Sequence, residues 1–288
     1  MRQSGRILVL ALAALFLGGC VGMQTQTRSS VVDYLYPDEK ASAIEPSIPQ
    51  LRLPLRVGIA FVPEQQQRVR GVNVWAISNT EGGLTEARKM ALLKRVADDF
   101  KSYDFVKSIE VIPSAYLTPR GSFKNLDQIK TMYGIDVIAL VSYDQVQFTD
   151  EGFTSLAYWT LVGAYVVSGE KNDTSTMLDT AVYDINSRKM LFRAPGLSRV
   201  QGRATAINLS EQLRKDSLKG FELATEDMIT NLTQQLDAFK EKVKENPQEY
   251  RISHKSGYSG GGGGTFGPFE LLLGALLGRA IIPQRRAS

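Results

Sequence analysis

The residues that carry most enzyme chemistry are scarce in this 288-residue sequence, which contains one histidine and one cysteine. His254 lies in a polar stretch before a glycine run, where no packed framework would orient it beside a serine, cysteine or aspartate. A structural zinc site needs several cysteine or histidine ligands, so neither a metal nor a cofactor is expected. The sequence therefore indicates no catalytic residue and predicts a protein that is not an enzyme.

Paired carboxylates are the remaining candidates for acid and base catalysis. The pairs Asp98-Asp99 and Glu226-Asp227 each fall on a predicted helix beside basic or polar residues. Such a pattern is typical of a solvated helix face rather than of a catalytic pair. A hydrolase that uses a carboxylate or a serine stays open as an alternative, and it would need a concave polar pocket.

Cys20 follows a short export-like segment, in which two arginines precede an apolar run over residues 7–17. This run is too short for a stable membrane span and is typical of a cleaved signal peptide covering residues 1–19. A plain secretory signal is the alternative. The residues before the cysteine resemble a lipobox, at which lipoprotein signal peptidase cleaves and the thiol receives a lipid: Leu17, Gly18, Gly19 and Cys20.

The lipobox resemblance implies a lasting membrane attachment through Cys20. Lipoproteins of this type carry three acyl chains, palmitate among them, and several chains give stable anchoring where one does not. With its only cysteine acylated, the exported protein would have no free thiol and no disulfide. Val21, rather than an aspartate, follows the cysteine, which favours the outer membrane or the cell surface.

The C-terminus is organised like a second targeting signal. A glycine run precedes a mainly apolar segment, residues 265–282, which is about long enough to enter a bilayer, and Arg285 and Arg286 would hold its end on the cytoplasmic side. This layout resembles the GlyGly-CTERM tail that the protease rhombosortase recognises, so the tail would lie only transiently in the inner membrane. A glycine linker to a small packed helix is the alternative. The expected cleavage region consists of Ser259, Gly260, Gly261, Gly262, Gly263 and Gly264.

Net charge gives no support for a nucleic-acid partner. Residues 1–19 hold two arginines and no acid, and the tail beyond Gly264 holds three arginines against one glutamate, so the formal net charge of +4 falls to about zero without these ends. The basic balance belongs to the predicted targeting signals, and no nucleic acid is expected as a partner.

A short aromatic motif, residues 29–37, follows the predicted lipidation site and reads Ser-Ser-Val-Val-Asp-Tyr-Leu-Tyr-Pro. Together with the lipobox and the GlyGly tail, it resembles the rhombotarget lipoprotein family. That resemblance implies processing by rhombosortase and supplies no catalytic residue. Tyr34, Leu35 and Tyr36 are expected to fasten the N-terminal segment onto the domain, or else to contact a ligand or partner.

The first half of the domain alternates apolar strands with amphipathic helices. Strands are predicted at residues 55–62, 105–112 and 135–148. Helices are predicted from Thr85 to about residue 102 and over 125–133, where Leu126, Ile129 and Met132 share a face and Gly134 is the C-cap. This β-α-β-α-β order predicts an α/β layer with a partly parallel sheet. The intervening residues 64–83 read as a loop with a short strand at 72–77.

The second half of the domain follows a different pattern. Residues 174–185 and 189–202 flank a turn-like Asn-Ser pair and predict a hairpin with solvated charges at its turn. A helix is predicted from Ser210 until Asn246-Pro247 stops it, with an exposed basic end at 240–244. Residues 156–167 are apolar and read as a core helix or buried strand. The order of elements over the whole domain, β-α-β-α-β followed by a hairpin and a long helix, resembles that of the periplasmic α/β domains of lipoproteins in curli-secretion and Tol systems.

These patterns divide the chain into five parts of one fold class, α/β with α+β character. A single periplasmic-type domain, with a long C-terminal helix, is flanked by flexible targeting ends. The parts are the signal peptide 1–19, the lipidated cysteine and tether 20–50, the domain 51–247, a flexible stalk 248–264 and the sorting tail 265–288.

The leading functional prediction is a non-enzymatic envelope lipoprotein whose domain binds or scaffolds something at the outer membrane or cell surface. Its expected partners are lipid through Cys20, lipoprotein signal peptidase and rhombosortase. The alternative is an assembly or secretion component of the curli-secretion or Tol type. Such a component would form a homo-oligomer or bind an envelope protein through residues 156–167 and the long helix.

Overall fold

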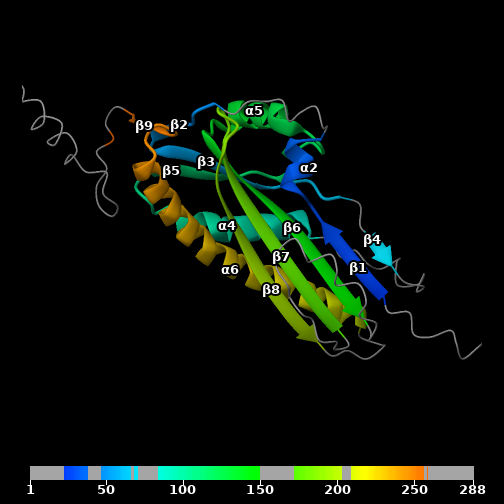
Figure 1. The fold of residues 1–288 in the computed structure, drawn as a ribbon. Helices are drawn as coiled ribbons and strands as arrows, with labels where there is room; N and C mark the ends of the chain where they lie inside the picture. The colour runs from blue at the N-terminus through cyan, green and yellow to red at the C-terminus, as the bar shows by residue number, and fades with distance from the viewer. Residues whose placement is uncertain are drawn as a thin grey trace, which may run out of the picture.

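A mixed sheet lies between two helical layers in the part of the chain that the structure describes (Figure 1). The structure is a computed structural model that describes residues 23–37, 47–65, 68–70, 84–149, 172–202, 209–255 and 258. One apolar cluster fills each face of the sheet, as expected for a layered domain. The predicted fold class, α/β with a long C-terminal helix, is confirmed.

The predicted β-α-β-α-β core is present. β3 pairs in parallel with β5 on one side and with β6 on the other. The helix between β3 and β5 packs on one face of the sheet and the helix between β5 and β6 on the opposite face. The elements are β3 (Leu55–Phe61), α4 (Glu86–Phe100), β5 (Val106–Val111), α5 (Ser122–Tyr133) and β6 (Val137–Thr149).

The predicted hairpin and long helix complete the domain. β7 (Asn172–Asp184) is antiparallel to β6, and β8 (Met190–Gly202) is antiparallel to β7. α6 (Leu209–Glu245) lies across this hairpin on the same face as α4, with its apolar side toward the sheet. It ends one residue before Asn246-Pro247, since proline removes a backbone donor and disfavours helix in the residue before it.

The N-terminal segment is not the tether that the sequence predicts. Met23–Arg28 forms β1, which is antiparallel to the distal half of β6, and β4 (Arg68–Arg70) pairs with the outer edge of β1. The inward-facing residues of β1 include Thr25 and Thr27, which are buried although they are polar. β1 therefore lacks the alternation of apolar and polar residues by which a strand is recognised in a sequence. The folded domain therefore begins by Met23, three residues after Cys20.

The aromatic motif fastens this segment to the domain, as predicted. Ser30 caps α2 (Val31–Leu35) by accepting a hydrogen bond from the backbone N–H of Asp33. Tyr34 is buried and donates its hydroxyl to Asn125 Oδ1 at 2.7 Å, and Leu35 is buried beside it. Burial raises the pKa of Tyr34 well above its usual range.

The C-terminal stalk is shorter than predicted. β9 (Arg251–His254) lies parallel to β2 (Gln50–Leu53), and together they cover one end of the main sheet. Lys255 Nζ lies 3.3 Å from Asp136 Oδ2, which also accepts from Arg56. Hydrogen bonds from these two cations lower the pKa of Asp136 although burial opposes them. Residues 248–255 therefore belong to the folded domain.

Three local predictions are wrong. Met132, which was expected on the buried face of α5, is 60% exposed. The buried face continues from Ile129 to Tyr133, which is four residues later, and not to Met132, which is three residues later. Asp184, expected to be solvated, is 1% exposed, and its carboxylate accepts from the Ser187 backbone N–H at 3.0 Å to fold the hairpin turn. Val243 is buried within the basic end of α6, which was expected to be exposed.

Several predicted features lie outside the described residues. They include the lipobox Leu17, Gly18, Gly19 and Cys20, the cleavage region from Ser259 to Gly264, the basic pair Arg285 and Arg286, the apolar segment 156–167 and the strand 72–77. Within the described ranges, no helix combines the length and the hydropathy that a membrane crossing requires.

Candidate ligand-binding site

α6 meets the sheet in two different ways along its length, and the N-terminal half makes a close polar contact. Gln145 Nε2 donates to Thr176 Oγ1 at 2.7 Å and to the Ser217 carbonyl at 3.1 Å. Gln147 repeats the arrangement two residues further along β6, donating to Thr174 Oγ1 at 3.1 Å and to the Leu213 carbonyl at 2.8 Å. Each buried amide thus joins the sheet to the helix.

Two glycines make this approach close. A Cβ added at Gly220 would lie 2.5 Å from Thr176 Oγ1, and one added at Gly196 would lie 2.2 Å from the carbonyl oxygen of Ala224. No real side chain tolerates such distances. The backbone of β8 therefore touches that of α6 because position 196 is glycine, and α6 lies directly on the Thr176 side chain because position 220 is glycine.

The C-terminal half of α6 contacts β8 through Asn231, whose side chain donates to the Pro195 carbonyl at 2.8 Å, and through the rings of Phe239 and Phe192. Beside these contacts, the same half of the helix borders a cavity of about 780 Å³ that the sheet and α4 also line. Protein interiors are packed as densely as organic crystals, so an internal space of this size is unusual unless something fills it. The volume falls within the roughly 300–1,000 Å³ that small-molecule sites occupy.

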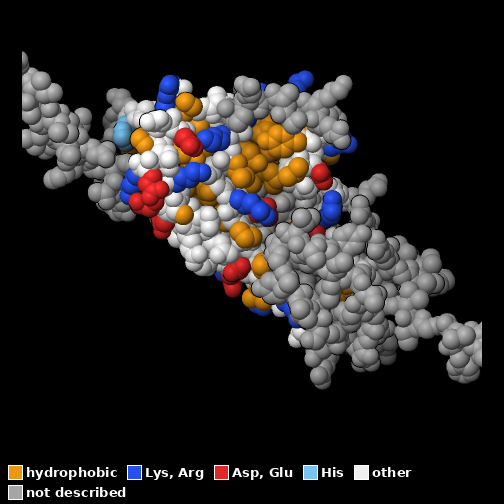
Figure 2. Space-filling model, in the orientation of Figure 1, with side chains coloured by type: hydrophobic (Ala, Val, Ile, Leu, Met, Phe, Trp, Pro, Cys, Tyr) orange, Lys and Arg blue, Asp and Glu red, His pale blue; other side chains and the backbone are white. Residues whose placement is uncertain are grey.

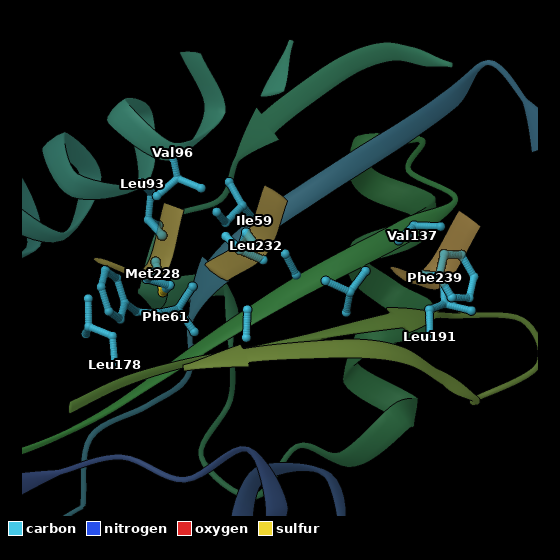
Figure 3. Packing of buried hydrophobic residues seen from close by; sticks show 14 of the residues in the cluster. Ile59, Phe61, Leu93, Val96, Val137, Leu178, Leu191, Met228, Leu232 and Phe239 are labelled. Atoms are coloured by element: carbon cyan, nitrogen blue, oxygen red, sulfur yellow. The ribbon is translucent and has the colours of Figure 1, made fainter. Parts of the chain in front are cut away.

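The walls of the cavity are almost entirely apolar. Figure 3 shows Val137, Leu191 and Phe239 gathered at one end of the cluster, and Leu93 and Val96 near the other. Thr180 supplies a hydroxyl, 2.9 Å from Met228 Sδ. The apolar wall residues are Leu51, Leu53, Leu55, Val57, Ile59, Val96, Ala97, Phe100, Phe105, Val106, Ile109, Val137, Ala139, Val182, Leu191, Phe192, Leu232, Leu236, Phe239, Val243 and Ile252.

The polar and ionisable lining residues sit at the rim. Ser102 and Asp104, in the turn between α4 and β5, and His254, in β9, are all exposed. Tyr258 stacks on His254 with ring centroids 5.6 Å apart. Burial, and then the nearby charge of Asp104, raises the pKa of Tyr258, and both residues line the cavity.

Lys240 is the rim residue that can approach an anion. Its Nζ lies 2.9 Å from Asp237, 5.2 Å from the ring centre of Tyr103 and 5.4 Å from that of Phe105. The stem of such a lysine follows apolar surface while its ammonium stays in water. The cavity thus combines an apolar interior with an amphipathic mouth.

This arrangement suits binding better than catalysis. An apolar chain loses contact with water inside the cavity at a gain of roughly 25 cal/mol per Å². A polar substrate would lose hydrogen bonds that the walls cannot replace. The hydrolase alternative needs a concave polar pocket, and this concave site is apolar. The described ranges hold no cluster of three His, Cys, Asp or Glu side chains that could ligate a metal.

The carboxylate pairs lie on helix surfaces, as predicted. Asp98 accepts from Lys94 and Lys101, each at 2.7 Å, and these hydrogen bonds lower its pKa to about 2. Glu226 pairs with Arg95 at 3.0 Å, and Asp227 accepts from the Leu197 backbone N–H at 2.8 Å.

His254 is exposed, as predicted, although it lies on a paired strand at the cavity mouth rather than in a stalk. Sequence reasoning found the apolar stripe of α6 but missed the cavity, because periodicity shows which side chains face inward and not how far apart the two layers stand. The placement of His254 beside this mouth was missed for the same reason.

A second apolar surface lies on the opposite face of the sheet. Figure 2 shows apolar side chains gathered beside α5 and α2. Tyr36, Phe123 and Tyr183 contact one another edge to face, with ring centroids 5.6 and 5.9 Å apart. Val32 and Tyr36 are 65% and 37% exposed, so part of the aromatic motif remains accessible after it has fastened the N-terminal segment.

No protein-family model matches the chain, and no curated protein is significantly similar to it. Among solved structures, protein XCC0632 from Xanthomonas campestris, of the family DUF330, is 10% identical with a TM-score of 0.31, and the match covers 67% of this chain and 91% of that protein. Lipoprotein GNA1162 from Neisseria meningitidis is 12% identical with a TM-score of 0.22, covering 57% of this chain and 96% of that protein. At these scores the function has to be argued from the site itself.

Proposed function

We propose that this chain is a non-enzymatic lipoprotein of the bacterial envelope, anchored through Cys20, whose domain binds an apolar ligand with a long hydrocarbon chain. The observation that carries the binding proposal is the apolar cavity of about 780 Å³ between the sheet and the C-terminal half of α6. A hydrocarbon chain is the ligand chemistry that these walls favour, since they offer wide apolar contact and few hydrogen-bond partners.

The lipid anchor is supported by the residues from Leu17 to Cys20, and the start of β1 gives the anchor a consequence. Two residues separate Cys20 from Met23, and the three steps along the chain between them span at most about 10 Å. A lipid on Cys20 would therefore hold one end of the sheet beside the membrane surface. The apolar, glycine-preceded tail supports processing by rhombosortase, with the outer membrane or cell surface as the final location.

Filling the cavity tests the binding proposal. Ala139 lines the cavity from near the start of β6, and Ala139→Phe would place a ring inside it. We expect the full chain to bind a fluorescent long-chain fatty acid saturably, and Ala139→Phe to weaken binding by about tenfold or more, equivalent to about 1.4 kcal/mol. A matched control, Val32→Phe on the exposed face of α2, should bind as tightly as the unaltered chain. Absence of saturable binding to the unaltered chain would refute the proposal.

Mass spectrometry of the mature protein tests the two processing signals separately. We expect an acylated N-terminal Cys20 in all cells, and a C-terminus shortened near Ser259 to Gly264 only in cells that contain rhombosortase. An identical C-terminus with and without the protease would remove the sorting-tail proposal, and an unmodified Cys20 would remove the lipid anchor.

A further inference from the structure

The two predicted membrane attachments leave the domain at opposite ends. Met23, at the start of β1, pairs with Thr149 at the end of β6. Lys255, which follows β9, lies beside Asp136, directly before the start of β6. β6 has 13 residues, so at a rise of about 3.3 Å per residue these points lie roughly 40 Å apart. Figure 1 shows β1 and β9 at opposite ends of the sheet.

The mouth of the cavity belongs to the C-terminal end of the domain. The residues that line it there include His254, Tyr258 and the turn of residues 102–105. Figure 2 shows His254, the pale blue side chain, at the end where β9 lies in Figure 1. Only the six residues 259–264 separate Tyr258 from the apolar tail.

Chain reach distinguishes the two attachments. From Tyr258 to Thr265 the chain spans at most about 25 Å, so an inserted tail holds the mouth close to its bilayer. Acyl chains on Cys20 occupy half of a hydrocarbon core of about 30 Å, and so extend only about 15 Å. They cannot reach a mouth roughly 40 Å away, which excludes the protein's own lipid as the occupant of the cavity.

The side chains of the rim fit a bilayer surface. Tyr103 stacks against Phe100 with ring centroids 5.8 Å apart and contacts Phe105 at 5.3 Å, and Tyr258 also lines the cavity. Amphipathic aromatic rings of this kind favour the interface between water and hydrocarbon. Lys240 adds a cation that can approach lipid phosphate by exchanging its ion pair with Asp237, and Asp104 is an acid among the lining residues.

We propose that the cavity mouth contacts the bilayer that the C-terminal tail enters, and that the cavity takes up an acyl chain of a membrane lipid there. The inference rests on the proposed function, because it needs both the cavity and an inserted tail. Attachment through Cys20 alone imposes no such contact, so removal of the tail ends loading and leaves the domain with the lipid that it already holds.

Changing the length of the stalk tests this proposal on the full chain. We would express the chain in a host without rhombosortase, reconstitute it in vesicles of phosphatidylethanolamine and phosphatidylglycerol, and measure initial lipid uptake per protein by native mass spectrometry. One variant has twenty Gly/Ser residues inserted after Tyr258, and its matched control has the same insertion before Met23. Uptake from the attached bilayer should follow effective concentration, which falls roughly as the −3/2 power of linker length.

Lengthening the spacing from seven to twenty-seven residues should therefore slow uptake about eightfold, while the N-terminal insertion leaves it unchanged. Equal uptake by both variants would overturn the proposal. If the variants then still bind free fatty acid, the proposed function survives and only the loading route is refuted. If the unaltered chain binds neither fatty acid nor bilayer lipid, the proposed function and this inference both fail.

Discussion

The two halves of α6 face the same sheet but contact it by different physical means. In the N-terminal half, Gln145 and Gln147 bridge to the helix, and two glycines allow a close approach of helix and sheet. In the C-terminal half, leucines and phenylalanines surround a space of about 780 Å³. Hydrogen bonds are directional and fix both distance and register, whereas apolar contact is non-directional. One half therefore sets the position of the helix, and the other half is free to enclose a ligand.

Replacing one phenylalanine in each half should give the largest difference. Phe221 is 1% exposed and contacts Tyr143 at a ring distance of 5.3 Å, so Phe221→Ala should lower the free energy of unfolding by about 4 kcal/mol. Phe239 already borders empty space, so Phe239→Ala should cost about 2 kcal/mol because fewer contacts are lost. Urea unfolding measures both values, and equal losses would remove the distinction between the halves.

Adding side-chain volume should have opposite effects at the close contact of α6 with β8 and at the cavity wall. Gly196→Ala places a Cβ 2.2 Å from the Ala224 carbonyl oxygen, and we expect a loss of about 2 kcal/mol because the helix must move. Ala97→Val, at the cavity wall, adds volume where space exists and should leave the stability unchanged or raise it by about 0.5 kcal/mol. Thermal unfolding of the two variants is the measurement, and a destabilised Ala97→Val protein would show that the cavity wall cannot accept volume.

The smallest expected effect is at Asp136, which binds Lys255 at the end of β9. The contacts of Asp136 with Arg56 and Lys255 lower the pKa of its carboxyl group in the folded protein. The stability that this carboxylate contributes is therefore fully present at pH values above its usual pKa of 3.8, and it is lost as the pH falls through the lowered pKa of the folded state. Asp136→Asn should therefore destabilise the protein slightly at pH 7, and the difference from the unaltered chain should vanish at strongly acidic pH. A difference that persists unchanged into acid would show that the carboxylate charge is not what secures Lys255.

Hydropathy patterns revealed the elements whose inward residues are apolar. The hairpin, α6 and the three central strands follow from periodicity and from breakers such as Pro247. The sequence did not predict β1 because its inward residues include Thr25 and Thr27, which are polar. It did not predict β9 because a segment of four residues with one isoleucine forms a strand only through its pairing with β2. The extents of the tether and stalk were therefore wrong.

The candidate site was only partly predictable for a related reason. The apolar residues of its helical wall, such as Leu232, Leu236 and Phe239, stand out in the sequence as an ordinary core stripe. Whether such an apolar stripe packs closely against the sheet or borders a cavity depends on the contacts made elsewhere along the helix. Here Gly196 and Gly220 fix one half, and neither glycine signals by itself that the other half will be open.

The central claim is that the C-terminal half of α6 encloses a site for a hydrocarbon chain, and a chain-length series tests it most directly. Calorimetric titration of the full chain with fatty acids of increasing length should show affinity rising with each methylene, by up to about 0.8 kcal/mol, until the cavity is full and the gain stops. Binding should also show a negative change in heat capacity. Affinity that is independent of chain length, or the absence of saturable binding at any length, would contradict the claim.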